Sequence, residues 1–200
     1  MQKSEVSIPS LPLMSKEEQH LFWCSIPKGG VCLEFGMGGS TRLFFARGVA
    51  ALYSVESDPE LMETVCGDIL LKANIASHRF FPIYADIGQV GQYGYPVGLP
   101  MPSWLNYHHT IWEKIPAEKL DFVFIDGRFR VACALQCFLR CRQGCTQLIH
   151  DFTPRPHYHL VLKYAEVVKQ AGSSVLLRRR VRANYKKMAL DLLNAQFTPV

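Results

Sequence analysis

The residues best suited to chemistry begin with a glycine-rich run, EFGMGGST, at residues 34–41. An apolar segment precedes this run and a helix-forming segment follows it. Glycines let the backbone turn tightly and approach a ligand that a Cβ atom would hold away. The amino end of a helix adds free N–H donors. The run therefore predicts a turn that binds a nucleotide-type ligand.

The residues around this turn indicate which nucleotide it holds. The dinucleotide pattern G-x-G-x-x-G requires glycine at position 41, where Thr41 stands. Glu34 lies two residues before the first glycine, at the end of a predicted strand. A carboxylate there is unfavourable beside a pyrophosphate, but it suits a ligand that carries ammonium and sulfonium charges. These features favour S-adenosylmethionine.

Two further acids follow at the ends of the next predicted strands. Glu56 ends the second strand, where a carboxylate can accept hydrogen bonds from both ribose hydroxyls. Asp86 ends the third strand, near the expected place of an adenine amino group. Open α/β sheets bind their ligands at the carboxyl ends of the strands. We therefore expect Glu34, Glu56 and Asp86 to lie along one edge of a sheet.

Alternating apolar and helical segments predict the elements that hold these residues. This alternation is typical of βα units around a parallel sheet. The predicted strands cover residues 31–35, 51–57, 79–86, 120–126, 146–152 and 174–181. The predicted helices cover residues 15–22, 40–47, 157–171 and 183–196, with another beginning at residue 58 and a further one between residues 126 and 146. We predict a single α/β domain over residues 1–200, with a Rossmann-like, doubly wound, mainly parallel sheet and helices on both faces.

Two segments stand apart from this alternation. Residues 1–28 form an arm and a short helix, which Ser15 and Glu18 open as a capping box. Residues 88–116 are rich in glycine and proline and contain the aromatic residues Tyr93, Tyr95, Trp104, Tyr107 and Trp112. A loop this long in a compact domain is usually functional, so we predict a lid or a substrate-recognition insertion. The alternative is a surface excursion that packs its own aromatic side chains.

Between residues 31 and 152 the chain carries, in order, LEFGMGGST, YSVESDPE, YADI, DFVFIDG and LIHDF. This series resembles the class I S-adenosylmethionine-dependent methyltransferases, and DFVFIDG resembles the fourth strand of their small-molecule O-methyltransferases. The resemblance implies methyl transfer from S-adenosyl-L-methionine to a small-molecule acceptor, either hydroxyl-bearing or anionic. The implied cofactor contacts are Glu34, Gly36, Met37, Gly38 and Ser40 around the methionine end, Glu56 at the ribose, Asp86 and Ile87 at the adenine, and Asp126 beside the methionine and the substrate.

Methyl transfer is an in-line displacement at an activated carbon, so the main task of the enzyme is to align nucleophile, methyl group and sulfur. A base helps when the acceptor is a hydroxyl. The candidate catalytic residues follow the fourth and fifth predicted strands and are Asp126, His150 and Asp151. Arginine side chains match carboxylates and phosphates. The predicted substrate contacts are therefore Arg128, Arg155 and His157.

A metal site is not predicted. Metal-dependent catechol-type methyltransferases place one carboxylate after the fourth strand and an Asp-Asn pair after the fifth. Asp126 and Asp151 match the first two of these positions, but Phe152 occupies the third. The set of oxygen ligands is therefore incomplete.

Four cysteines recur at intervals of four residues, at Cys133, Cys137, Cys141 and Cys145. This spacing places neighbours on one face of a helix. A metal or iron–sulfur site is one interpretation, but known cluster signatures use other spacings and no histidine or acid completes a ligand set. We predict instead that these thiols are reduced and pack a helix against the sheet, because free cysteine is among the most buried residue types.

Composition and charge limit the remaining function classes. No apolar run reaches the ~20 residues of a membrane-spanning helix, and the first residues lack the apolar core of a secretory signal. We therefore expect a cytoplasmic protein that does not bind membranes. The net charge is +5 with a basic cluster at residues 178–187, so a nucleic-acid methyltransferase is a minor alternative. A second alternative is a cofactor-binding sensor or scaffold without catalysis, and the formation of a homo-oligomer stays open.

Overall fold

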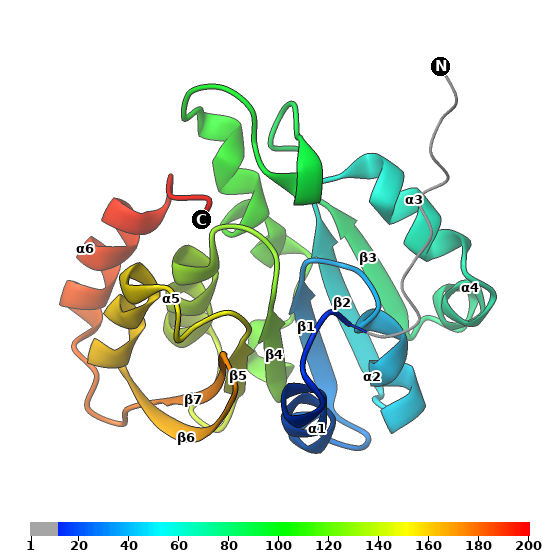
Figure 1. Ribbon diagram of the computed structural model, residues 1–200, viewed down its shortest axis with the longest axis horizontal. Coiled ribbons are helices and arrows are strands. Elements are labelled where there is room, and N and C mark those ends of the chain that lie inside the picture. Colours follow the sequence, from blue (N-terminus) through cyan, green and yellow to red (C-terminus); the bar gives the residue numbers. More distant parts are fainter. Residues whose placement is uncertain (1–11) are drawn as a thin grey trace.

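A seven-stranded sheet forms the centre of the protein (Figure 1). The structure is a computed structural model that describes residues 12–200, so residues 1–11 of the predicted arm lie outside it. The strands in spatial order are β3 (Phe80–Tyr84), β2 (Ala51–Glu56), β1 (Val31–Phe35), β4 (Phe122–Ile125), β5 (Thr146–Ile149), β7 (Ser174–Arg179) and β6 (Ala165–Ala171). β1 to β5 run parallel, whereas β7 is antiparallel to both β5 and β6. The prediction of a mainly parallel sheet is confirmed.

Helices cover both faces of this sheet (Figure 1). They are α1 (Lys16–Ser25), α2 (Thr41–Arg47), α3 (Pro59–Gly67), α4 (Ile69–Ala76), α5 (Arg130–Arg140) and α6 (Tyr185–Ala195). Side chains alternate along a strand. On β4, Phe124 therefore packs in the apolar cluster with α1 to α4, whereas Ile125 packs in the cluster with α5 and α6. Burial on both faces explains why the central strands read as continuous apolar runs.

The connections between the strands create a crevice at one edge of the sheet. From β1 the chain proceeds outward through β2 to β3, then returns to place β4 on the other side of β1. The loops after β1 and β4 therefore lead away from each other, at what is called a topological switch point. Ligands of open α/β sheets bind in the crevice at this point.

The predicted helix over residues 157–171 is wrong. Pro156–Lys163 forms 3₁₀ turns, and Ala165–Ala171 is the edge strand β6. β6 and β7 are joined by a two-residue turn in which Gly172 adopts a φ of 53°, a left-handed conformation that favours glycine. The pairing of these two strands overrides the helical pattern, and Ser174–Arg179 becomes the seventh strand instead of the sixth.

The insertion at residues 88–116 divides into two parts. Three of its aromatic side chains, Trp104, Tyr107 and Trp112, are buried in the main core. Tyr93 is 75% exposed and Tyr95 is 41% exposed. The second half of the insertion is therefore part of the core, which neither the lid nor the surface excursion predicted, whereas the first half is largely exposed.

The cysteine stripe packs α5 against the sheet. Cys133 and Cys137 lie within α5, and Cys141 follows its last residue. All three side chains are buried in the main apolar core, and the thiols are free. The packing interpretation of this stripe is confirmed. Within residues 12–200, no helix combines the length and apolar character needed to cross a membrane.

Candidate active site

The glycine turn after β1 is anchored by Glu34, which lies near the end of that strand. Its carboxylate accepts hydrogen bonds from the hydroxyls of Ser40 (2.6 Å), Thr41 (2.8 Å) and Ser54 (2.6 Å). The Glu34 side chain is fully buried. These bonds connect the start of α2 and the strand β2 to β1, so they fix the shape of the turn.

This geometry gives Glu34 a role that the sequence did not indicate. Burial raises the pKa of Glu34 to about 7, although the three hydroxyl hydrogen bonds oppose the rise. A carboxyl group with this pKa carries only part of a negative charge at neutral pH, which weakens its attraction for a cationic ligand. Direct contact between Glu34 and a cofactor stays a prediction, and so does that of Ser40, whose hydroxyl donates to Glu34.

The pKa of Glu34 makes its contribution to stability depend on pH. Its folded value of about 7 exceeds the reference value of 4.5, so folding favours the protonated carboxyl. The resulting stabilisation is fully present below pH 4.5 and is lost as the pH rises through 7. We expect the stability advantage of the wild type over Glu34→Gln to shrink by about 3 kcal/mol between pH 4.5 and pH 8. Urea unfolding of both proteins at several pH values measures the difference in their free energies of unfolding. A difference that does not change with pH would contradict the raised pKa of Glu34.

Glu56, at the end of β2, faces the same turn. Its Oε2 accepts the N–H of Met37 (3.1 Å), and its Oε1 accepts the N–H groups of Ser57 (2.7 Å) and Asp58 (2.9 Å). Burial raises the pKa of Glu56, and these N–H bonds oppose the rise. Oε1 also accepts the hydroxyl of Ser57 (3.5 Å), so its acceptor positions are filled. Each carboxylate oxygen has about two acceptor positions, so Oε2, which accepts only the N–H of Met37, retains capacity for one further hydrogen bond from a ligand hydroxyl.

The largely exposed part of the insertion, residues 88–98, lies over Glu56. A Cβ atom added to Gly94 would lie only 3.4 Å from Oε1 of Glu56. The next residue, Tyr95, faces the guanidinium carbon of Arg128 with its ring centroid 5.9 Å away. The segment thus reaches from the end of β2 to the loop after β4. This position suits the predicted lid, whose closing function stays a prediction.

Asp86 and Ile87, which follow β3, lead the chain into the insertion. The Asp86 carboxylate accepts the N–H of Gly88 (2.9 Å), and its carbonyl accepts a hydrogen bond from Asn106 (2.7 Å). Asp86 is exposed, whereas Ile87 is buried in the core. Both residues lie at the predicted edge of the sheet, and their contact with an adenine stays a prediction.

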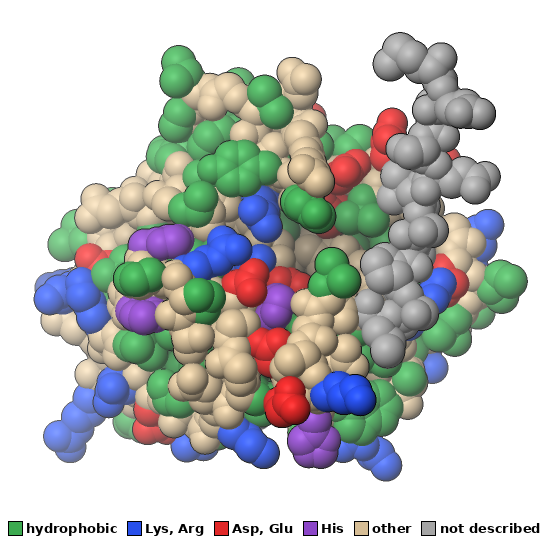
Figure 2. All heavy atoms as spheres, in the orientation of Figure 1, with side chains coloured by type: hydrophobic (Ala, Val, Ile, Leu, Met, Phe, Trp, Pro, Cys, Tyr) green, Lys and Arg blue, Asp and Glu red, His purple; other side chains and the backbone are tan. Residues whose placement is uncertain are grey.

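The three predicted catalytic residues come together at the carboxyl ends of β4 and β5. Nδ1 of His150 donates to Oδ1 of Asp126 (2.9 Å), and Nε2 of His150 lies 3.7 Å from Oδ1 of Asp151. The Asp126 side chain is 29% exposed and that of His150 is 10% exposed. Figure 2 shows acidic, basic and histidine side chains gathered near the middle of one face of the molecule. Asp126 is therefore the more accessible member of a hydrogen-bonded pair.

The charge state of His150 depends on these neighbours. Burial lowers the pKa of His150, but the hydrogen bond to Asp126 and the negative charges of Asp126 and Asp151 outweigh burial and raise it above its ordinary value. Arg130 acts in the opposite direction by its positive charge. His150 is consequently more often protonated at neutral pH than a free histidine would be.

Arg130 is a residue of the site that the sequence analysis missed. Its buried guanidinium donates to the carbonyls of Asp126, Gly127 and His150 and lies 3.2 Å from the Asp126 carboxylate. It therefore holds the ends of β4 and β5 together. Its position four residues after Asp126, one helical turn away, is the signal that could have identified it.

The predicted substrate residues take three different environments. Arg155 is paired with Asp151 (3.2 Å) and donates to the hydroxyl of Tyr158 (3.2 Å). Arg128 forms no ion pair with any residue of the described chain, and its Nε is buried without a hydrogen-bond partner there. His157 is exposed and packs edge-on against Tyr158. Of the two arginines, Arg128 is the one whose charge is left unpaired within the described chain.

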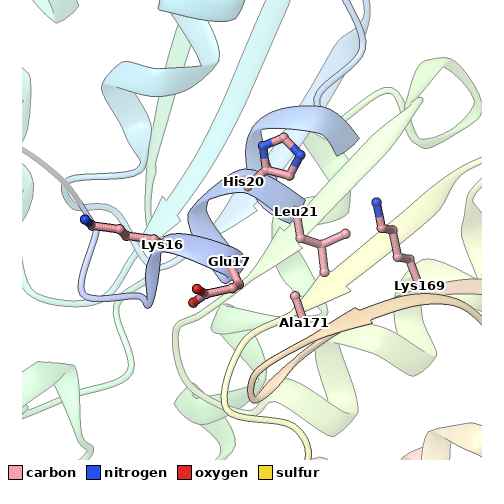
Figure 3. Close-up of a pocket in the computed structure, with 6 residues that line it drawn as sticks. All are labelled: Lys16, Glu17, His20, Leu21, Lys169 and Ala171. Carbon is pink, nitrogen blue, oxygen red and sulfur yellow. The ribbon is translucent and has the colours of Figure 1, made fainter.

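A hollow on the surface lies between α1 and β6. Figure 3 shows that α1 and β6 border it, with the lining residues Lys16, Glu17, His20, Leu21, Lys169 and Ala171. It contains none of the predicted catalytic, cofactor or substrate residues. The candidate site is therefore the crevice at the strand ends and not this hollow.

No protein-family model matches the chain, and no curated protein matches it. Among solved structures, a methyltransferase-like protein from Silicibacter pomeroyi is similar over 96% of this chain and 100% of its own, with 24% identity and a TM-score of 0.75. The O-methyltransferase from Bacillus cereus in complex with SAH is similar over 86% and 84%, with 16% identity and a TM-score of 0.56. A methyltransferase from Geobacter sulfurreducens is similar over 85% and 82%, with 14% identity and a TM-score of 0.51. The chain therefore has the Rossmann-like fold of the class I S-adenosylmethionine-dependent methyltransferases.

Proposed function

We propose that this protein transfers the methyl group of S-adenosyl-L-methionine to a small-molecule acceptor. The observation that carries the proposal is the hydrogen-bonded pair of Asp126 and His150 at the ends of β4 and β5. This pair lies at the edge of the sheet where open α/β folds bind their ligands. The similarity to the O-methyltransferase from Bacillus cereus, which is in complex with SAH, supports the same cofactor.

The residues at this edge fit the cofactor. No atom lies within 4 Å of the position that a Cβ atom on Gly38 would take, so the glycine turn is open on that side. Oε2 of Glu56 has acceptor capacity for one ribose hydroxyl. Asp126 adds a partly exposed carboxylate, which suits a cationic ligand. Within residues 12–200, no three Cys, His, Asp or Glu side chains are placed to hold a metal ion, and we assign none of these residues to one.

The side chains of the pair have distinct tasks in this proposal. The bound cofactor would supply a methyl group activated by a positively charged sulfur. Asp126, as the more exposed member, accepts the proton of the acceptor hydroxyl. His150 donates its Nδ1–H to Asp126 and so orients that carboxylate. Arg130 keeps the two strand ends in register through its carbonyl contacts.

A hydroxyl-bearing acceptor that is also anionic fits the charges of the site. Arg130 lies against Asp126, and Arg155 lies against Asp151, so both cations have acidic partners. Arg128 has none within the described chain, and it lies beyond the end of β4. A guanidinium fork matches a carboxylate or phosphate. Arg128 is therefore the arginine that we assign to the negative group of the acceptor.

The basic cluster at residues 178–187 has six cations, of which two are engaged within the protein. Arg178 is paired with Glu166 (2.8 Å), and Arg179 donates to the side chain of Gln143 (3.0 Å). The other four, Arg180, Arg182, Lys186 and Lys187, are exposed. We base the choice of a small-molecule acceptor on Arg128 at the strand ends and keep nucleic acid as the minor alternative, which the tRNA arm of the screen tests.

Titration calorimetry and a methyl-transfer screen test the proposal. We expect S-adenosylmethionine and SAH to bind with Kd values of roughly 1 μM–1 mM, and NAD not to bind. In the screen we expect transfer to hydroxylated carboxylic acids in preference to their neutral analogues and to tRNA. Binding of NAD without SAH would overturn the cofactor assignment. SAH binding without transfer to any acceptor would favour the sensor or scaffold.

A further inference from the structure

Glu18 is a buried carboxylate that the proposed reaction does not use. It lies on α1, is 5% exposed, and belongs to the capping box of that helix. Its Oε2 accepts the N–H of Ser15 (2.8 Å), and its own N–H donates to the Ser15 hydroxyl (3.2 Å). The cap therefore occupies Oε2 and leaves Oε1 for other partners.

Oε1 of Glu18 holds the turn between β6 and β7. It accepts the N–H of Ser173 (2.8 Å), the hydroxyl of Ser173 (2.6 Å) and that of Ser174 (3.3 Å). A Cβ atom on Gly172 would lie 2.9 Å from the Glu18 carboxyl carbon, so the turn fits closely around this side chain. α1 is thereby hydrogen-bonded to the turn that joins β6 and β7, the last two strands in the order of the sheet.

The same turn holds the segment that carries two of the candidate catalytic residues. The carbonyl of Ser173 accepts the N–H groups of Phe152 (2.7 Å) and Thr153 (3.2 Å), directly after His150 and Asp151. Asp151 has a φ of 53°, a left-handed conformation that is uncommon outside glycine, although aspartate adopts it more often than most residues. Contacts from the surroundings help to impose such a conformation. The contact between Glu18 and Ser173 is part of what imposes it.

Glu18 also faces His150 directly. Its Oε1 lies 3.9 Å from Nε2 of His150, on the opposite side of the ring from Asp126. The charged groups around His150 come from four parts of the chain and are Glu18 on α1, Asp126 after β4, Arg130 on α5 and Asp151 after β5. Burial raises the pKa of Glu18, but hydrogen bonds from Ser173 and Ser15, with the charge of His150, lower it to about 2. Glu18 is therefore a carboxylate at every pH at which the protein would work.

We propose that Glu18 is a positioning residue for the Asp126–His150 pair. It fixes the 150–153 segment through Ser173, and it places a negative charge against Nε2 of His150, so that Nδ1 stays directed toward Asp126. The effect of Glu18 on catalysis rests on the proposed function. The contact between Glu18 and His150 can be tested without it.

The test compares Glu18→Gln with Glu17→Gln. The two variants lose the same charge from adjacent positions of α1, but Glu17 is exposed and makes no contact with His150. NMR titration of the His150 imidazole in the cofactor-free protein is the first measurement, with the resonance assigned by its loss in His150→Gln. Because an imidazolium loses a negative neighbour, we expect a lower pKa of His150 in Glu18→Gln and an unchanged one in Glu17→Gln.

Kinetics are the second measurement. We expect kcat of Glu18→Gln to fall about tenfold, which is a minor part of the ~10²–10⁴-fold contribution of a general base, with its pH profile displaced in the direction of the His150 titration. Glu18→Asp keeps the charge and should restore both properties in part. A cap that only stabilises α1 would lower stability without moving the titration.

The outcomes separate this inference from the proposed function. A folded Glu18→Gln protein with the wild-type His150 titration would overturn the positioning role. Should that variant not fold, an unshifted titration in Glu18→Asp, whose carboxylate is withdrawn by one methylene, would overturn it as well. A protein that fails to bind SAH would overturn methyl transfer, whereas a shifted His150 titration in the same protein would still support the contact with Glu18.

Discussion

The Asp126→Asn variant is expected to lose methyl transfer, with kcat lower by about 10²–10⁴-fold at saturating cofactor and acceptor. Asparagine keeps the shape of the side chain and can still accept the Nδ1–H of His150, but it cannot take a proton from the acceptor. It also removes the charge that lies 3.2 Å from Arg130. Initial-rate kinetics measure the loss, and calorimetry with SAH checks that the variant still binds the cofactor and is saturated in the assay.

Asp151→Asn is the matched control for this experiment. It removes the same charge from the neighbouring strand end, but the Asp151 carboxylate is paired with Arg155 (3.2 Å) and makes no hydrogen bond to His150. Because this ion pair is partly open to solvent, it contributes little energy, and we expect kcat to fall by about fivefold at most. If Asp126→Asn kept the wild-type kcat while Asp151→Asn lost it, the role of base would pass to Asp151.

The central strands could be predicted from the sequence because their burial produces a recognisable local pattern of residues. β1 and β4 are buried on both faces, so each is a continuous apolar run between polar segments. β6 has no continuous apolar run, because most of its residues are exposed at the edge of the sheet. Its structure depends on pairing with β7 across Gly172. A contact of this kind is not a local pattern, and a helix was predicted in its place.

The same distinction explains which site residues could be predicted. Asp126 and His150 each follow a parallel strand, and the carboxyl ends of such strands meet at one edge. Glu18 joins the site only because α1 packs near the turn between β6 and β7, which no local pattern records. The orientation of Glu34 depends on Ser54 of the neighbouring strand. The residue types at the ends of the parallel strands were thus predictable, whereas side-chain direction required the packed structure.

Gly127→Ala is expected to destabilise the protein by about 1–3 kcal/mol, the usual cost of overpacking. An added Cβ atom would overlap the hydroxyl oxygen of Tyr107 and lie 3.0 Å from the backbone nitrogen of Gly36. Tyr107 is buried and cannot move aside freely. The loops after β1 and β4 therefore touch through their backbones, with no room for a side chain between them. Urea unfolding measures the loss, and unchanged stability would show that this contact is looser than the structure has it.

Gly38→Ala makes the same chemical change in the glycine turn after β1. Here we expect an unchanged stability and a weaker affinity for the cofactor. No atom lies within 4 Å of the new Cβ position, and Gly38 does not have a positive φ, so stability should change by less than about 0.5 kcal/mol. A cofactor that lies against this open side of the turn would meet the added methyl group, and its affinity should fall about tenfold, or about 1.4 kcal/mol. Calorimetry with SAH on the folded variant measures this. Unchanged SAH affinity in Gly38→Ala would mean that the cofactor does not approach the glycine turn, because a site that uses this turn leaves no space for the methyl group.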